Sequence, residues 1–163
     1  MTGNPLQLIR FLTEQNNDTL FDLAPHKERR TRSQNAYYWQ LVTKVADRLR
    51  VSKNHVHNAF LRSYGQLLYI DGQLVTTYIP DTEEAERTAL EAAEFHIKPT
   101  SQVKAGNKGQ LLRTYVLLKG SSDYNTAEMS ALVDGAVMEA KQLDIETLTP
   151  AELERMRLNE KHN

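Results

Sequence analysis

The residues best suited to bind a ligand or do chemistry lie in one stretch, 29–39, which reads RRTRSQNAYYW. Three arginines stand before a Gln-Asn pair and three successive aromatic residues, and the last of these, Trp39, is the only tryptophan of the chain. Cations beside aromatic rings suit single-stranded nucleic acid, because cations bind phosphates and rings stack on bases. At about 100° per residue on a helix, Tyr37, Lys44 and Arg48 share one flank. The sequence therefore predicts a nucleic-acid contact there, with Tyr37 as the stacking ring.

A second basic stretch contains the loop KAGNKGQ, residues 104–110, from which lysines could reach a nucleic-acid backbone. Other roles stay open for part of the first stretch. Gln34 and Asn35 are also suited to bonding local backbone groups, and Trp39 to anchoring a core or a dimer interface. The candidate DNA-binding residues are Arg29, Arg30, Arg32, Gln34, Asn35, Tyr37, Lys44, Arg48, Lys104, Lys108 and Arg113.

The charge of the chain is distributed in alternating blocks. The formal net charge of -1, taken alone, argues against a nucleic-acid binder. However, residues 26–62 hold nine basic and two acidic side chains, and residues 98–122 hold five basic and no acidic ones. Residues 81–94 and 123–163 are acidic. Basic blocks of this size can bind phosphate backbones, whereas the alternative is that each block pairs with an acidic neighbour.

Local signals predict the elements that position these residues. Asp71-Gly72 favours a type I′ hairpin, and Asp81 with Glu84 predicts a capping box. Asn4, Ser33, Ser52 and Thr149 are suited to begin helices. The predicted elements are a helix over 5–15 and a strand over 20–24 (N-terminal unit 1–24), helices over 33–50 and 52–64 (basic helical region 26–64), a hairpin (66–79), an acidic helix (81–95), a basic loop and strand (104–118), and helices over 126–143 and from 149 (C-terminal helices 126–160).

These elements predict a single α+β domain over residues 1–163, in which helices surround a small antiparallel sheet. The apolar stripe of the helix over 33–50 should enter its core. The stripe consists of Tyr38, Leu41, Val42, Val45 and Leu49. On the helix over 126–143, the small residues Gly135, Ala136 and Ala140 would permit close packing, so we expect a homodimer seam there.

Two segments resemble a known family. The pattern R-T-x-x-Q-N-x-x-x-W at Arg30, Thr31, Gln34, Asn35 and Trp39 resembles the R-S-x-x-Q-N-x-x-x-W signature of the phage NinB (Orf) recombination proteins. The segment GSSDYNTAEM at 120–129 resembles that family's Ser/Thr-rich strand end and the helix after it. The longer segment GSSDYNTAEMSALVDG is closer still to uncharacterised proteins of phages that infect Gram-positive bacteria. The middle of the chain, 51–109, lies outside the resemblance.

The resemblance implies a phage or prophage recombination mediator. Such a protein is a homodimer, intertwined or packed through helices. It binds single-stranded DNA without catalysing a reaction. It helps to load a recombinase onto strands coated by single-strand-binding protein, in the cytoplasm of the bacterial host.

Two other function classes remain as alternatives. A metal-dependent, structure-selective or HNH-type phage nuclease would need a cluster of carboxylates or histidines around an ion. His55 and His57 are two positions apart on a helix and point about 200° apart, so they do not predict a shared metal. The second alternative is a protein-interaction adaptor that binds no DNA.

Several classes are excluded by what the sequence lacks. It has no cysteine, which removes disulfides and thiol chemistry, and it has no phosphate-binding loop or dinucleotide fingerprint, so we expect no cofactor. No apolar run approaches the roughly 20 residues of a membrane span, and the N-terminus does not read as a signal peptide. We therefore expect a cytoplasmic protein that does not bind a membrane.

Overall fold

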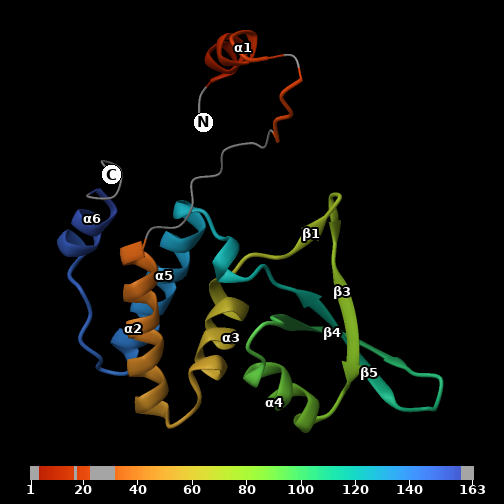
Figure 1. The fold of residues 1–163 in the computed structure, drawn as a ribbon. Helices are drawn as coiled ribbons and strands as arrows, with labels where there is room; N and C mark the ends of the chain where they lie inside the picture. The colour runs from red at the N-terminus through yellow and green to blue at the C-terminus, as the bar shows by residue number, and fades with distance from the viewer. Residues whose placement is uncertain (1–3, 17, 23–31, 159–163) are drawn as a thin grey trace.

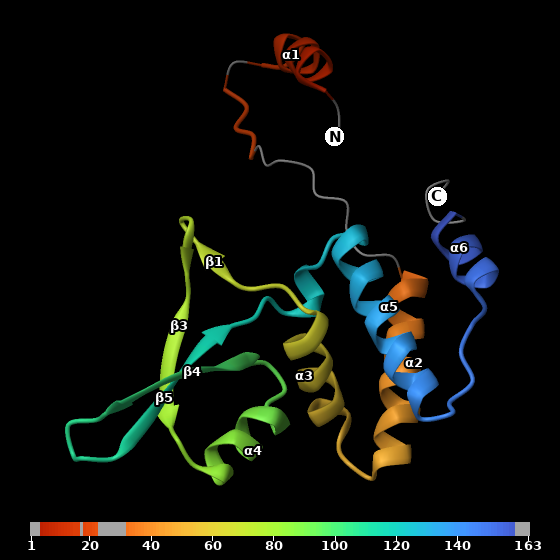
Figure 2. The ribbon, with the colours of Figure 1, turned by 180° about the vertical axis from the view of Figure 1, so that it is seen from behind.

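The computed structural model describes residues 4–16, 18–22 and 32–158. Residues 32–158 form the predicted α+β domain, with a three-stranded sheet at one end, α2, α5 and α6 at the other, and α3 and α4 between them (Figures 1 and 2). The elements are α1 (Pro5–Thr13), α2 (Arg32–Leu49), α3 (Lys53–Tyr64), β1 (Tyr69–Ile70), β2 (Gln73–Leu74), β3 (Thr76–Pro80), α4 (Glu83–Glu91), β4 (Ile97–Ala105), β5 (Leu111–Leu117), η1 (Ser121–Asp123), α5 (Thr126–Gln142) and α6 (Pro150–Leu158). None of these helices is both long and apolar enough to cross a membrane.

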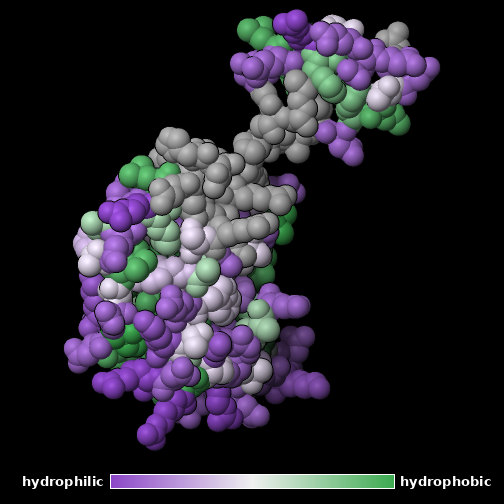
Figure 3. All heavy atoms as spheres, turned by 60° about the vertical axis from the view of Figure 1, so that its left-hand side comes forward, coloured by the Kyte–Doolittle hydropathy of each residue, from purple (hydrophilic) through white to green (hydrophobic). Residues whose placement is uncertain are grey.

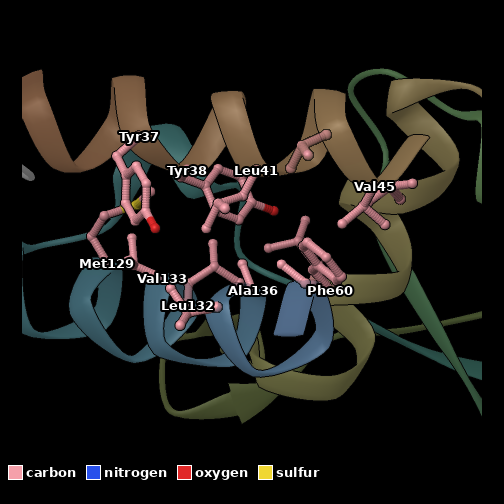
Figure 4. Packing of buried hydrophobic residues seen from close by; sticks show 14 of the residues in the cluster. Tyr37, Tyr38, Leu41, Val45, Phe60, Met129, Leu132, Val133 and Ala136 are labelled. Carbon is pink, nitrogen blue, oxygen red and sulfur yellow. The ribbon is translucent and has the colours of Figure 1, made fainter. Parts of the chain in front are cut away.

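The main core lies between α2, α3 and α5. Figure 4 shows side chains of α2 pointing toward α5, with Phe60 of α3 beside them. Tyr38 and Leu41 are buried as predicted, against Met129 and Leu132. Leu49 was predicted on the same stripe, but it is half exposed because it is the last residue of α2, where the chain turns away.

The small residues of α5 pack inside the chain. A Cβ on Gly135 would lie 2.3 Å from the ring of Tyr64, and Ala136 and Ala140 are fully buried in the core. The predicted dimer seam at these residues is therefore wrong, because α3 and α2 already occupy that face of α5.

Most helix starts are confirmed by their capping bonds. The side chains of Asn4 and Ser52 accept from backbone N–H groups at the starts of α1 and α3, and Thr149 does so at α6. Two predicted starts are corrected. Ser33 lies inside α2, which begins one residue earlier. Asp81 does not cap α4, because Thr82 takes that position.

The sheet was predicted less well than the helices. The Asp71-Gly72 turn is confirmed, with a positive φ at both residues, but the hairpin contains only two residue pairs. Beyond it, β3 pairs with β5, and the unpredicted strand β4 pairs with the other edge of β5. The helix predicted over 81–95 ends at Glu91. Residues 20–22 of the strand predicted over 20–24 have no regular structure, and the rest lies outside the described residues.

Candidate nucleic-acid interface

Arg29 and Arg30 lie outside the described residues, and Arg32 is described only as the first residue of α2. The family resemblance at these positions therefore remains a prediction from sequence.

Gln34 and Tyr37 lie in the interior. Gln34 is fully buried, and its Nε2 donates to Ser130 Oγ at 2.8 Å. The Tyr37 ring belongs to the main core, and its hydroxyl accepts from the backbone N–H of Leu148 at 2.9 Å. Burial raises the pKa of Tyr37, and the bond from Leu148 lowers it by less. A ring held in this way is not a surface for stacking, which corrects the role predicted for Tyr37.

Other predicted residues of α2 reach the surface. Lys44 is exposed and donates from Nζ to the carbonyl of Glu146 at 3.3 Å, and Arg48 is exposed near the end of the helix. Asn35 is partly buried in the first turn. The side of the molecule that carries α2 and α6 is covered mostly by hydrophilic side chains, with hydrophobic ones in small separate spots (Figure 3). The α2 cations thus lie on a mixed polar surface.

The second basic block divides into two groups. Arg113 Nε bonds Asp81 Oδ1 at 2.7 Å, and Lys119 Nζ bonds Glu128 Oε2 at 2.6 Å. Lys98, Lys104 and Lys108 are exposed and form no ion pair with a described residue. The acidic blocks therefore neutralise part of this basic block and leave three lysines available.

The acids near the sheet gather on its inner face, toward α3 and α4. Glu86 of α4 accepts hydrogen bonds from Arg62 of α3 and from the Tyr115 hydroxyl of β5. Burial alone would raise the pKa of Glu86, but these bonds and the guanidinium charge hold it below its usual value. Burial and the bond to Glu86 raise the pKa of Tyr115 to about 12. This network joins the sheet to α3 and α4 and holds the Glu86 carboxylate, which is about a third exposed, on that side of the sheet.

The outer face of the sheet follows from the strand register. Residues directly opposite each other in an antiparallel sheet project to the same face. Tyr115, opposite Thr77 and Pro99, packs inward against Ala89. The alternate set therefore faces outward: Thr76, Tyr78, Pro80, Lys98, Lys104, Leu112, Thr114 and Val116. We call these eight residues the outer sheet face; it contains no acidic residue.

Tyr78 and Lys104 form the centre of this face. Lys104 Nζ lies 3.2 Å from the centre of the Tyr78 ring, and that ring is half exposed. Lys98 lies on the same face, and Lys108 lies in the turn that joins β4 to β5. Sequence reasoning identified Lys104 and Lys108 but missed Tyr78 and Lys98. The alternation of exposed and half-buried positions along β3 marks Tyr78 as outward, once β5 is known to be its partner.

Among the described residues, the structure does not bring the cations of the two predicted basic stretches together. Lys44 and Arg48 belong to α2, whereas Lys104 and Lys108 belong to the sheet end, and α3 and α4 lie between (Figures 1 and 2). Among the described residues, the sheet end combines exposed cations with an exposed aromatic ring, Tyr78, whereas α2 presents its cations without one.

The histidines of α3 point to different surroundings. His55 Nδ1 lies 3.2 Å from Glu91 Oε1, whereas His57 is buried and bonds the Tyr38 hydroxyl at 2.7 Å. Among residues 4–16, 18–22 and 32–158, no three metal-ligating side chains form a possible metal site.

Comparison of the chain with protein-family models, curated proteins and solved structures found no match.

Proposed function

We propose that this protein binds single-stranded DNA through the outer sheet face, as a non-catalytic accessory of phage or prophage recombination. The observation that carries the proposal is the exposed Tyr78 ring with Lys104 and Lys98 on a face that has no acidic residue. The recombination role comes from the family resemblance of the sequence, as do the proposed bacterial cytoplasm, homodimer, recombinase and single-strand-binding protein.

The chemistry of this face fits an unpaired strand. Lysines neutralise phosphates and release counterions, and an exposed ring provides a π-face on which an unpaired base can stack. A sheet surface with an exposed aromatic ring is an established platform for single-stranded nucleic acids. In duplex DNA the bases are stacked on each other, so a tyrosine on a sheet gains less from them. We therefore expect the protein to prefer single strands.

Binding across a salt series tests the proposal. Fluorescence anisotropy of labelled single-stranded and duplex oligonucleotides should show tighter binding to the single strand, with affinity falling as salt rises. Replacing both Lys98 and Lys104 by glutamine should weaken binding. It should also reduce the slope of log affinity against log salt concentration by the amount expected for about two phosphate contacts.

A matched control removes two positive charges elsewhere. Lys141 and Arg155 are exposed on α5 and α6 and form no ion pair with a described residue. Replacing both by glutamine should leave the slope unchanged. If no DNA binds at low salt, the proposal is wrong and an adaptor becomes the better account; cleavage on adding magnesium would favour a nuclease.

A further inference from the structure

A pocket of about 380 Å³ lies where the sheet meets the loop before α5. Its walls come from the segment before β4, the end of β5 and η1. Leu68, Leu117 and Leu118 give it apolar sides, and Phe95 lines it with a ring that is about half exposed. A volume of this order suits a small planar group.

His96 supplies the most buried ionisable side chain of the pocket, with only 8% of its surface exposed. Its Nδ1 lies 2.7 Å from Asn58 Oδ1. The orientation of the Asn58 amide is fixed, because the two N–H groups of Nδ2 point at three backbone carbonyl oxygens, those of Asn54, Leu90 and Ala92. Asn58 Oδ1 can only accept, so Nδ1 of His96 carries the proton. Nε2 of the neutral ring is therefore a hydrogen-bond acceptor.

That acceptor is available to a ligand. Nε2 of His96 bonds no described residue and is not sealed from solvent. The adjacent ring atom Cδ2 lies 3.9 Å from the position that a Cβ of residue 120 would take, and this residue is Gly120. The absence of a side chain there leaves the imidazole edge open to the pocket.

The charged groups of the pocket favour a hydrogen-bond donor and disfavour an anion. Glu94 and Asp123 are exposed carboxylates at the pocket, and Lys119, its only cation, is held by Glu128. Burial lowers the pKa of His96, so the imidazole remains neutral at neutral pH. A phosphate would meet two negative charges here, whereas an amino group on a flat ring would meet acceptors and an aromatic wall.

We propose that this pocket binds one unstacked nucleobase of the DNA strand, with its exocyclic amino group donating to Nε2 of His96 and its ring against Phe95. This rests on the function proposed above and adds a base preference to it. The two sites are adjacent along the strands, because His96 and Leu118 of the pocket lie two residues from Lys98 and Val116 of the outer sheet face.

Decamers of deoxycytidine and deoxythymidine test the proposal, because they carry equal phosphates, whereas cytosine has an exocyclic amino donor where thymine has a carbonyl oxygen. Thymine also differs in its N3–H and its ring methyl group, so the pocket variants are compared on both decamers. At neutral pH and fixed salt, the full chain should bind the deoxycytidine decamer about three- to ten-fold more tightly, as expected for one hydrogen bond. His96→Gln and Gly120→Ala should each abolish this preference. Gly120→Ala adds a methyl group at ordinary contact distances, so it narrows the pocket without strain. Met138→Ala, at an exposed site on α5, is the control and should retain the preference.

The possible results separate the two proposals. Equal binding of both decamers, or a preference that survives both pocket variants, overturns the base site and leaves the DNA-binding function standing. Failure of both decamers to bind overturns the function, and the base site falls with it. As a direct readout, deoxycytidine monophosphate should shift the Nε2 resonance of His96 in NMR spectra. A response to an arginine amide, but not to the nucleotide, would assign the pocket to a peptide and contradict the proposal.

Discussion

The ammonium nitrogen of Lys104 lies 3.2 Å from the centre of the Tyr78 ring, across the central strand of the sheet. Lys104 is opposite Leu112 and Tyr78 is opposite Thr114, so the contact runs diagonally over β5. A cation above an aromatic face is attracted by the ring quadrupole and holds the ring in place. The pair thus presents a positive charge and a positioned ring on one surface.

Replacing Tyr78 by leucine should weaken single-stranded DNA binding by about 1–3 kcal/mol, the range measured for stacking of one base on an aromatic side chain. Tyr78→Phe keeps the π-face and should retain most of the affinity. Because the ring is half exposed, the free energy of unfolding, measured in urea, should change little for either variant. Equal affinity for wild type and Tyr78→Leu would show that the ring does not contact the strand.

Tyr37→Phe separates a core role from a contact with DNA. The Leu148 N–H would lose its acceptor, so the free energy of unfolding should fall by about 1 kcal/mol. Urea denaturation measures this loss. DNA affinity should stay unchanged, because the ring is buried. Reduced affinity with unchanged stability would restore the stacking role that sequence predicts for Tyr37.

Gly135→Ala should destabilise the protein by about 1–3 kcal/mol, because the new methyl group would overlap the Tyr64 ring, which must shift. Ala131→Ser, at an exposed position on the same helix, is the control and should have a much smaller effect. Thermal unfolding of both variants provides the comparison. A stable Gly135→Ala variant with an altered oligomeric state would instead place this glycine in an interface between copies.

Protonation of His96 should make stability depend on pH. Burial lowers the pKa of His96 in the folded chain below its usual 6.5. The unfolded chain therefore binds the proton first as the pH falls, and folded-state stability is lost as the pH drops through 6.5 toward the folded pKa. Urea unfolding between pH 7.5 and about 5 should show this decline, and His96→Gln should reduce it. An identical decline in the variant would assign the effect to other groups.

The helices could be predicted because their signals are local. Asn4, Ser52 and Thr149 begin helices through bonds to residues three positions away, which a sequence pattern displays directly. The sheet depends on distant partners. β4 carries Pro99 and three polar residues, Thr100, Ser101 and Gln102, near its centre, so its sequence does not read as a strand. Only its pairing with β5 makes it one.

The candidate site was predicted in part for the same reason. A helical wheel places Tyr37 on a flank beside the apolar stripe, but the segment after α5 returns and covers that flank through Leu148. The cations of 98–122 were recognised from sequence, but the sequence does not show which of them form ion pairs. Arg113 pairs with Asp81, which lies far away in the sequence, and Lys119 pairs with Glu128, which lies across the turn before α5. Tyr78 became a candidate only when the strand register placed it beside Lys104.

The most direct test is to map the contact of single-stranded DNA on the folded chain by NMR. Adding a deoxycytidine decamer to the isotope-labelled protein should shift the backbone amides of the outer sheet face, with the largest changes at Tyr78, Lys98 and Lys104. The backbone amide resonances of Lys44 and Arg48 should not shift. Shifts that gather on α2 and spare the sheet would contradict the outer sheet face as the DNA-binding surface.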